Sequence, residues 1–226
     1  TATVIASDDY SSYTASTIPA TVTIDGVVYQ VKEIGNGAFR DRYRLQNVTI
    51  SEGIETIGKE AFQWCGNADF GTLPSSLRKI DQNAFYDCDR IQKLELPEGL
   101  LTIGNNAFQS CSGMQKVVLP STLTSIEYGA FNNTSSLTAV VSRIQTPFEI
   151  NKNVFGSESW NSETQQYEYV CAADLYVPEG TIEQYKRTIR RTIREAKYYI
   201  LENKLAMTVL FGVLIIILGF FGFRYY

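Results

Sequence analysis

One phrase of seven residues recurs five times along the chain at a constant interval of 23 residues. It reads EIGNGAF at 33–39 and returns as TIGKEAF, KIDQNAF, TIGNNAF and SIEYGAF. Each copy carries an isoleucine and a phenylalanine in the same places: Ile34, Ile57, Ile80, Ile103 and Ile126, with Phe39, Phe62, Phe85, Phe108 and Phe131. A degenerate sixth copy lies at 150–155. A period between roughly 20 and 50 residues is typical of solenoids, so the chain is predicted to be a stack of repeats.

Between these phrases, apolar residues alternate with other residues in short runs such as V-x-I and L-x-L. Such alternation predicts a short strand with one buried face. A single unit of 23 residues cannot bury its apolar face alone, so neighbouring copies must stack. The fold class predicted is therefore mainly β, a β-solenoid of 23-residue repeats whose interior is filled by the phenylalanine column.

Composition argues against several classes of function. The 226 residues include 20 basic and 24 acidic residues, a net charge of −4, and no histidine. The absence of histidine excludes Ser-His-Asp and Cys-His catalysis and histidine metal sites. The acidic balance gives no reason to expect a nucleic-acid partner. We therefore expect no enzymatic activity and no cofactor.

Three of the four cysteines, Cys65, Cys88 and Cys111, also recur at 23 residues. A functional interpretation is a metal or redox cluster. The alternative is a buried column of small, soft side chains. We favour buried free thiols, since side chains in one column point the same way and three cannot all pair.

The segments LPSTLTSIEYGAF and AFYDCDRIQKLELPEGLLTIGNNAFQSCSGMQKVVLP resemble the BspA-like leucine-rich repeats of bacterial and protist surface proteins. The opening STIPATVTIDGVVYQVKEIGNGAF resembles that family's N-terminal cap, and LYVPEGTIEQYK its terminal segment. The resemblance covers about residues 17–186. It implies a right-handed leucine-rich-repeat solenoid and a role in adhesion or ligand binding, with no catalytic residues.

These patterns divide the chain into five predicted segments. They are N-terminal cap strands at 1–33, the repeats at 34–155, a C-terminal cap hairpin at 156–180, a basic amphipathic helix at 181–204 and a transmembrane helix at 205–223. The last segment contains nineteen residues without a charge, enough to cross a hydrocarbon core of roughly 30 Å. The alternative, a buried helix, would need a cavity that a solenoid of this size does not offer. Gly212 and Gly219 lie seven residues apart and could share a packing face of this helix.

The predicted helix before this span carries five basic residues: Arg187, Arg190, Arg191, Arg194 and Lys197. They are expected to contact anionic lipid headgroups; the alternative is a solvated connector. Basic residues on this side of the span would place the solenoid in the cytoplasm by the positive-inside rule. The family resemblance places it outside, at the cell surface. We favour the outside because the opening TATVIASDDY lacks an initiator methionine, which suggests removal of a leader.

Outward-pointing strand positions are the candidate partner-binding residues, because repeat proteins bind partners along such aligned columns. The predicted set is Thr49, Phe70, Thr72, Lys93, Glu95, Lys116, Val118 and Val141. Val118 and Val141 would form an apolar patch, unless the C-terminal cap covers them.

The main functional hypothesis is a membrane-anchored binding or adhesion protein whose solenoid contacts a protein or glycan. The alternative is a structural or scaffold subunit of a membrane complex, packing through the face that carries Gly212 and Gly219. A hydrolase is a third hypothesis, which turnover of a polymer would support.

Overall fold

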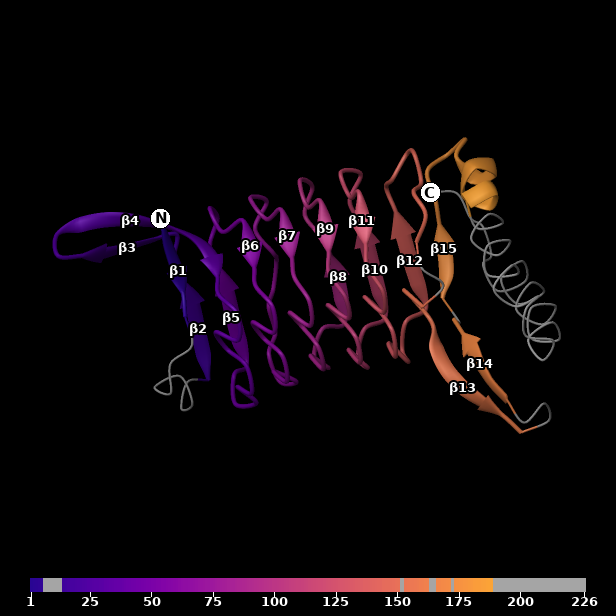
Figure 1. Cartoon of the computed structure of the whole chain (residues 1–226), viewed down its shortest axis with the longest axis horizontal. Helices are drawn as coiled ribbons and strands as arrows, with labels where there is room; N and C mark the ends of the chain where they lie inside the picture. The colour runs from indigo at the N-terminus through magenta and orange to yellow at the C-terminus, as the bar shows by residue number, and fades with distance from the viewer. Residues whose placement is uncertain (6–13, 151–152, 163–165, 172, 189–226) are drawn as a thin grey trace, which may run out of the picture.

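The computed structural model describes residues 1–5, 14–150, 153–162, 166–171 and 173–188. Their strands stack side by side into a rod, with a projecting hairpin at the N-terminal end and a second hairpin at the other (Figure 1). The predicted mainly β solenoid of parallel-strand repeats is therefore confirmed. The strands are β1 (Ala2–Val4), β2 (Ala15–Ile18), β3 (Thr21–Ile24), β4 (Val27–Ile34), β5 (Asn47–Ile50), β6 (Thr56–Ile57), β7 (Lys79–Ile80), β8 (Lys93–Glu95), β9 (Thr102–Ile103), β10 (Lys116–Leu119), β11 (Ser125–Ile126), β12 (Ala139–Ser142), β13 (Ser157–Asn161), β14 (Gln166–Val170) and β15 (Asp174–Tyr176).

Three strands of a first parallel sheet, β7, β9 and β11, are each followed along the chain by one strand of a second parallel sheet, β8, β10 and β12 respectively. The first sheet has the order β1-β4-β6-β7-β9-β11, with β3 added to β4 as an antiparallel hairpin. The second has the order β15-β12-β10-β8, and β2 pairs with β5 separately. Within the first sheet the register follows the sequence period, so Ile57 lies opposite Ile34 and Ile80. The repeated isoleucine therefore occupies the same place in every coil.

The core is built from the repeated columns. Phe62, Phe85, Phe108 and Phe131 are buried and stack with nearly parallel rings, and successive centroids lie 5.0–5.4 Å apart. Phe39 and Phe155 extend the stack at its two ends. Since stacked coils repeat at about the strand spacing, a ring in one coil meets its equivalent in the next. The phenylalanine column predicted from the sequence is therefore the axis of the core.

The cysteine column lies beside this axis. Cys65, Cys88 and Cys111 are buried free thiols, and each donates a hydrogen bond to the carbonyl oxygen of a phenylalanine 26 residues earlier in the chain. Burial raises the pKa of all three thiols, and that of Cys65 from 9.0 to about 12. Within the described residues, no group of three or more His, Cys, Asp or Glu could hold a metal ion. These cysteines tie adjacent coils together.

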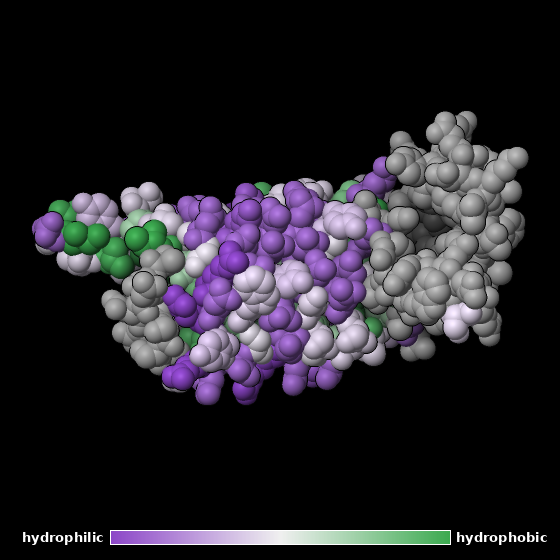
Figure 2. All heavy atoms as spheres, turned by 60° about the horizontal axis from the view of Figure 1, so that its bottom comes forward, coloured by the Kyte–Doolittle hydropathy of each residue, from purple (hydrophilic) through white to green (hydrophobic). Residues whose placement is uncertain are grey.

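A hairpin of strands closes each end of the rod. Figure 2 shows apolar side chains of the β3–β4 hairpin at one end of a largely hydrophilic face. The exposed residues of this hairpin include Ile24, Val27 and Val28. At the other end β13 and β14 form an antiparallel hairpin, and β15 adds to β12.

The C-terminal predictions fall largely outside the described residues. A helix begins at 182 and is described as far as 188. It includes the exposed Arg187, whereas Arg190, Arg191, Arg194, Lys197 and the segment 205–223 with Gly212 and Gly219 lie beyond the described part. Among the described helical residues, none forms a helix long and apolar enough to cross a membrane.

Candidate functional site

The strand face of the second sheet carries most of the predicted partner-binding positions. Five of the eight residues predicted to point outward are exposed: Thr49, Thr72, Lys93, Glu95 and Lys116. Val141 is half-buried. The predictions for Phe70 and Val118 are wrong, and each has a separate physical cause.

Phe70 is in the core and not on the surface. Its side chain is only 5% exposed, and its ring meets the faces of Phe62 and Phe85 edge-on, at centroid distances of 4.9 and 4.8 Å. The expectation rested on a uniform spacing of 23 residues, which would put Gly71 in the buried column of Val48. In the structure Asn47 instead pairs with Asp69, one residue earlier than the period requires. Phe70 thereby takes the buried place that Gly71 has no side chain to fill.

Gly71 restores the register by absorbing the extra residue. It adopts a φ of 54°, in the left-handed region that glycine enters at little cost. Its amide donates a hydrogen bond of 2.9 Å to the carboxylate of Asp69. By Leu73 the chain has returned to the buried column that Ile50 also occupies. The segment 69–73 is therefore an irregular bulge where the other repeats have a strand.

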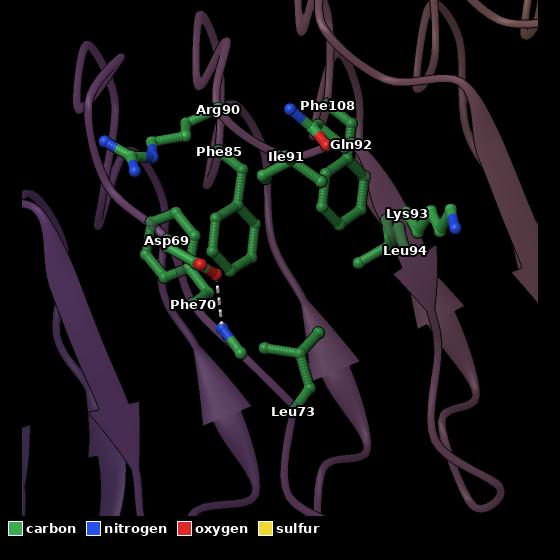
Figure 3. A pocket seen from close by; sticks show the side chains of 11 residues that line it. Asp69, Phe70, Leu73, Phe85, Arg90, Ile91, Gln92, Lys93, Leu94 and Phe108 are labelled. Carbon is green, nitrogen blue, oxygen red and sulfur yellow. Dashed lines mark hydrogen bonds between the residues drawn. The ribbon is translucent and has the colours of Figure 1, made fainter.

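The bulge interrupts the sheet. Within the described residues, no backbone hydrogen bond joins 69–73 to β8, and β8 is the edge strand of its sheet. A cavity of about 390 Å³ opens at this break. Figure 3 shows the rings of Phe70, Phe85 and Phe108 at the cavity, with Leu73 and Leu94 nearby and the polar side chains of Asp69, Arg90, Gln92 and Lys93 around it. The structure therefore places on the predicted binding face a pocket of mixed lining, in which largely buried aromatic and leucine side chains meet exposed polar ones.

The rim of the pocket and the strand beside it carry three basic side chains, those of Arg90, Lys93 and Lys116, and the one carboxylate of Asp69. Lys93 and Lys116 lie directly opposite each other in the register of β8 and β10. In the described part of the chain, neither lysine forms an ion pair, and Arg90 forms none either. Like charges directly opposite on neighbouring strands repel each other. This basic surface, defined by Arg90, Lys93 and Lys116, would be stabilised by an anionic group, although the chain as a whole is acidic.

Val118 is only 8% exposed because a long side chain crosses the strand that carries it. Arg143 follows β12, and its guanidinium contacts the carboxylate of Glu95 on β8 at 2.6 Å. Since β10 lies between β8 and β12, this ion pair spans β10. The hydrogen bond to Glu95 raises the pKa of Arg143 above its ordinary value. In place of the predicted apolar patch of Val118 and Val141, the surface here carries the ion pair of Arg143 and Glu95.

Sequence reasoning missed three polar residues of the pocket rim, Asp69, Arg90 and Gln92, because it considered only outward-pointing strand positions. A signal was present in the sequence. Gly71 is the one glycine in an otherwise apolar column that also contains Val48 and Leu94, and a glycine inside a strand pattern often marks a bulge.

These observations define the class of protein: a parallel β-solenoid of leucine-rich repeats. Comparison with known proteins identifies the family. Residues 32–161, more than half of the chain, match six copies of the BspA type leucine rich repeat region, and the chain belongs to this family. It matches none of the curated proteins with which it was compared.

Two solved structures show what the fold is similar to. The leucine-rich repeat protein of T. pallidum is 32% identical with a TM-score of 0.53, over 57% of this chain and 58% of that one. The pneumococcal vaccine antigen PcpA is 19% identical with a TM-score of 0.56, over 76% of this chain and 38% of that one. The chain thus spans less than two thirds of either protein.

Proposed function

We propose that this chain is a non-enzymatic binding protein of the cell surface, which holds an acidic segment of a partner protein on its strand face. The observation that carries the proposal is the pocket at the sheet break, which lies beside the basic surface of Arg90, Lys93 and Lys116. An apolar side chain of the partner enters the pocket, and neighbouring carboxylates of the partner contact the basic surface. Membership of a family of surface proteins with leucine-rich repeats supports the general role.

The pocket has room for an apolar side chain of a partner, and the basic surface can contact the partner's carboxylates. An aromatic or aliphatic side chain that enters the pocket covers the apolar part of its lining, which contributes roughly 25 cal/mol per Å² of apolar area removed from water. Such buried anchors carry most of the binding energy of a protein interface. Complementary charge around the anchor raises the association rate and selects among partners. The pocket therefore provides affinity and the basic surface provides selectivity.

Selection from a random peptide display library on the purified protein tests this proposal. We expect enriched peptides to combine an aromatic or leucine residue with adjacent Asp or Glu. Their affinity should fall more than tenfold in a Lys93→Glu/Lys116→Glu variant, and should also fall at high salt. The matched control is Lys59→Glu/Lys79→Glu, which changes the net charge equally at lysines that do not line the pocket. Enrichment without acidic residues, or equal binding by both variants, would contradict the proposal.

We also propose that the chain is held at a membrane by residues 205–223, preceded by the basic helix of 181–204, with the solenoid outside the cell. The support is the uncharged length of this segment and the family to which the repeats belong. Protease treatment of intact cells, followed by detection of residues 1–180, is the test. We expect cleavage without lysis, whereas cleavage only after lysis would place the solenoid inside.

A further inference from the structure

One turn recurs in every coil with the same unusual backbone conformation. Two residues after the phenylalanine of each of the five repeated phrases, φ is positive, between 57° and 62°. The residues in this position are Asp41, Trp64, Asp87, Ser110 and Asn133. Their amides repeat one bonding pattern: that of Trp64 donates to the carbonyl oxygen of Tyr86 in the next coil at 2.9 Å, and that of Asp87 to Gln109. These backbone hydrogen bonds between coils therefore hold the residue at this position in the left-handed conformation, whatever its side chain.

Trp64 is out of place in this series. Asp and Asn tolerate the left-handed region because their short polar side chains can bond locally, whereas a bulky residue there is an outlier. Trp64 gains no core packing in return, because its side chain is 37% exposed. Backbone strain of this kind gathers at functional sites, where the residue serves a purpose other than stability.

The indole ring is held in one orientation by its neighbours. The guanidinium carbon of Arg40 lies 4.8 Å from the ring centroid, and Arg40 is itself fixed by a 2.8 Å ion pair with Glu60. The ring of Tyr86 meets the indole edge-on at a centroid distance of 6.4 Å and an interplanar angle of 86°. A partly exposed aromatic ring that is already ordered loses little conformational entropy on binding. Trp64 is therefore a rigid platform.

An acceptor stands beside this platform. Asp87 occupies the equivalent position in the next coil and is half-buried. Among the described residues, no donor forms a hydrogen bond with its carboxylate. Burial and the charge of Asp89 raise the pKa of Asp87 above its ordinary value. The positive charge of Arg40 is already matched by Glu60 and Asp41. Arg40 is thus already engaged by two carboxylates, and the carboxylate of Asp87 would repel an anionic ligand.

We propose that Trp64 and Asp87 form a binding site for a neutral hexopyranose unit of a glycan. The axial C–H bonds of a pyranose form an apolar, weakly positive surface, which would stack on the face of the Trp64 indole opposite Arg40. Hydroxyl groups at the edge of the same sugar donate hydrogen bonds to the Asp87 carboxylate. Neither Trp64 nor Asp87 lines the pocket at the sheet break, and the site does not depend on the protein-binding role proposed for that pocket.

Tryptophan fluorescence tests the proposal directly. The chain has two tryptophans, so a Trp160→Phe background leaves Trp64 as the single reporter. We expect its emission to change saturably on titration with lactose, cellotriose or chitotriose, with dissociation constants of the order of 1 mM that are typical of a small contact. Sialyllactose and heparin disaccharides should bind more weakly, since both are anionic.

Substitutions separate binding from folding. Trp64→Asn places at this turn the residue that Asn133 already provides in another coil, so the variant should melt at the same temperature as the parent or higher. In the parent chain with both tryptophans, saturation-transfer NMR should then show loss of the sugar signal with Trp64→Asn, and at least a threefold reduction with Asp87→Asn. Ser110→Asn at the same turn is the control and should bind normally. Retained binding by Trp64→Asn, a melting temperature several degrees lower, or no binding of any neutral sugar would overturn the proposal.

Discussion

The thiol of Cys65 donates a hydrogen bond to the carbonyl oxygen of Phe39 over 3.0 Å, joining two adjacent coils inside the core. The same bond recurs from Cys88 to Phe62 and from Cys111 to Phe85, at 3.2 Å in each case. The cysteine column therefore links each coil to the one before it. Each thiol can donate its hydrogen bond only while it is protonated.

This requirement predicts a loss of stability at alkaline pH. Burial raises the pKa of Cys65 from 9.0 to about 12, so the folded state binds the proton more tightly than the unfolded state. The stability that depends on this proton is complete below pH 9 and declines as the pH rises toward 12. Each pH unit in that window should lower the free energy of unfolding by up to about 1.4 kcal/mol per thiol. Urea unfolding of the parent and of Cys65→Ser at several pH values measures the slope. A slope unchanged by the substitution would contradict the argument.

The phenylalanine stack predicts a large effect from a single truncation. Phe85 is 1% exposed and stacks on Phe62 and Phe108, and the edge of Phe70 also meets it. Phe85→Ala should lower the free energy of unfolding by about 3–5 kcal/mol, because a central cavity between coils cannot collapse easily. Denaturant unfolding is the measurement, and Lys93→Ala at an exposed strand position is the control, expected within about 0.5 kcal/mol of the parent. A small effect at Phe85 would mean that neighbouring coils close the gap.

The bulge at Gly71 yields a third prediction. Replacing Phe70 and Gly71 by Lys and Leu gives this repeat the residues of the next one, where Lys93 and Leu94 form β8. We expect this double variant to remain folded, pair with β8 and protect the amides of 69–73 from hydrogen exchange. Phe70→Ala alone should instead destabilise the rod by about 3–5 kcal/mol, since its ring is in the core. A Phe70→Ala variant as stable as the parent would show that Phe70 is not a core residue.

The sequence predicts the place of those residues that follow the 23-residue period, and it fails for those that do not. The core columns do obey this period, because a buried position must be apolar in every coil, and the alternation of Val48 and Ile50 is visible without a structure. The prediction for Phe70 was wrong because the register between two coils can shift by one residue even when the repeats have the same length. Which residue then turns inward is decided by side-chain volume, which a count of positions does not include.

The candidate sites were harder to predict because they arise from exceptions to the repeat. The pocket exists where one strand is missing, and its rim includes loop residues such as Asp69 and Arg90. Val118 is buried by Arg143, a residue 25 positions later that reaches across a strand. Trp64 is unusual only once the left-handed conformation of its turn is known. Each of these features depends on contacts between coils that a single repeat does not encode.

The end of the solenoid is fixed by a buried pair of hydroxyl groups, which gives the last prediction. The hydroxyl of Tyr185 donates to the carbonyl oxygen of Ile144 at 2.9 Å and lies 2.6 Å from the hydroxyl of Ser142, which is itself buried. This contact attaches the helix at 182–188 to the final coil.

Tyr185→Phe keeps the ring and removes only the hydroxyl group. The carbonyl oxygen of Ile144 then loses a buried hydrogen bond, and we expect the free energy of unfolding to fall by about 1–3 kcal/mol. Hydrogen exchange should increase first in 181–188, because the terminal helix detaches before the repeats unfold. Tyr128→Phe is the matched control, since Tyr128 is exposed and the same change should have little effect there. Equal stability of the two variants would mean that packing of the Tyr185 ring alone holds the helix on the solenoid.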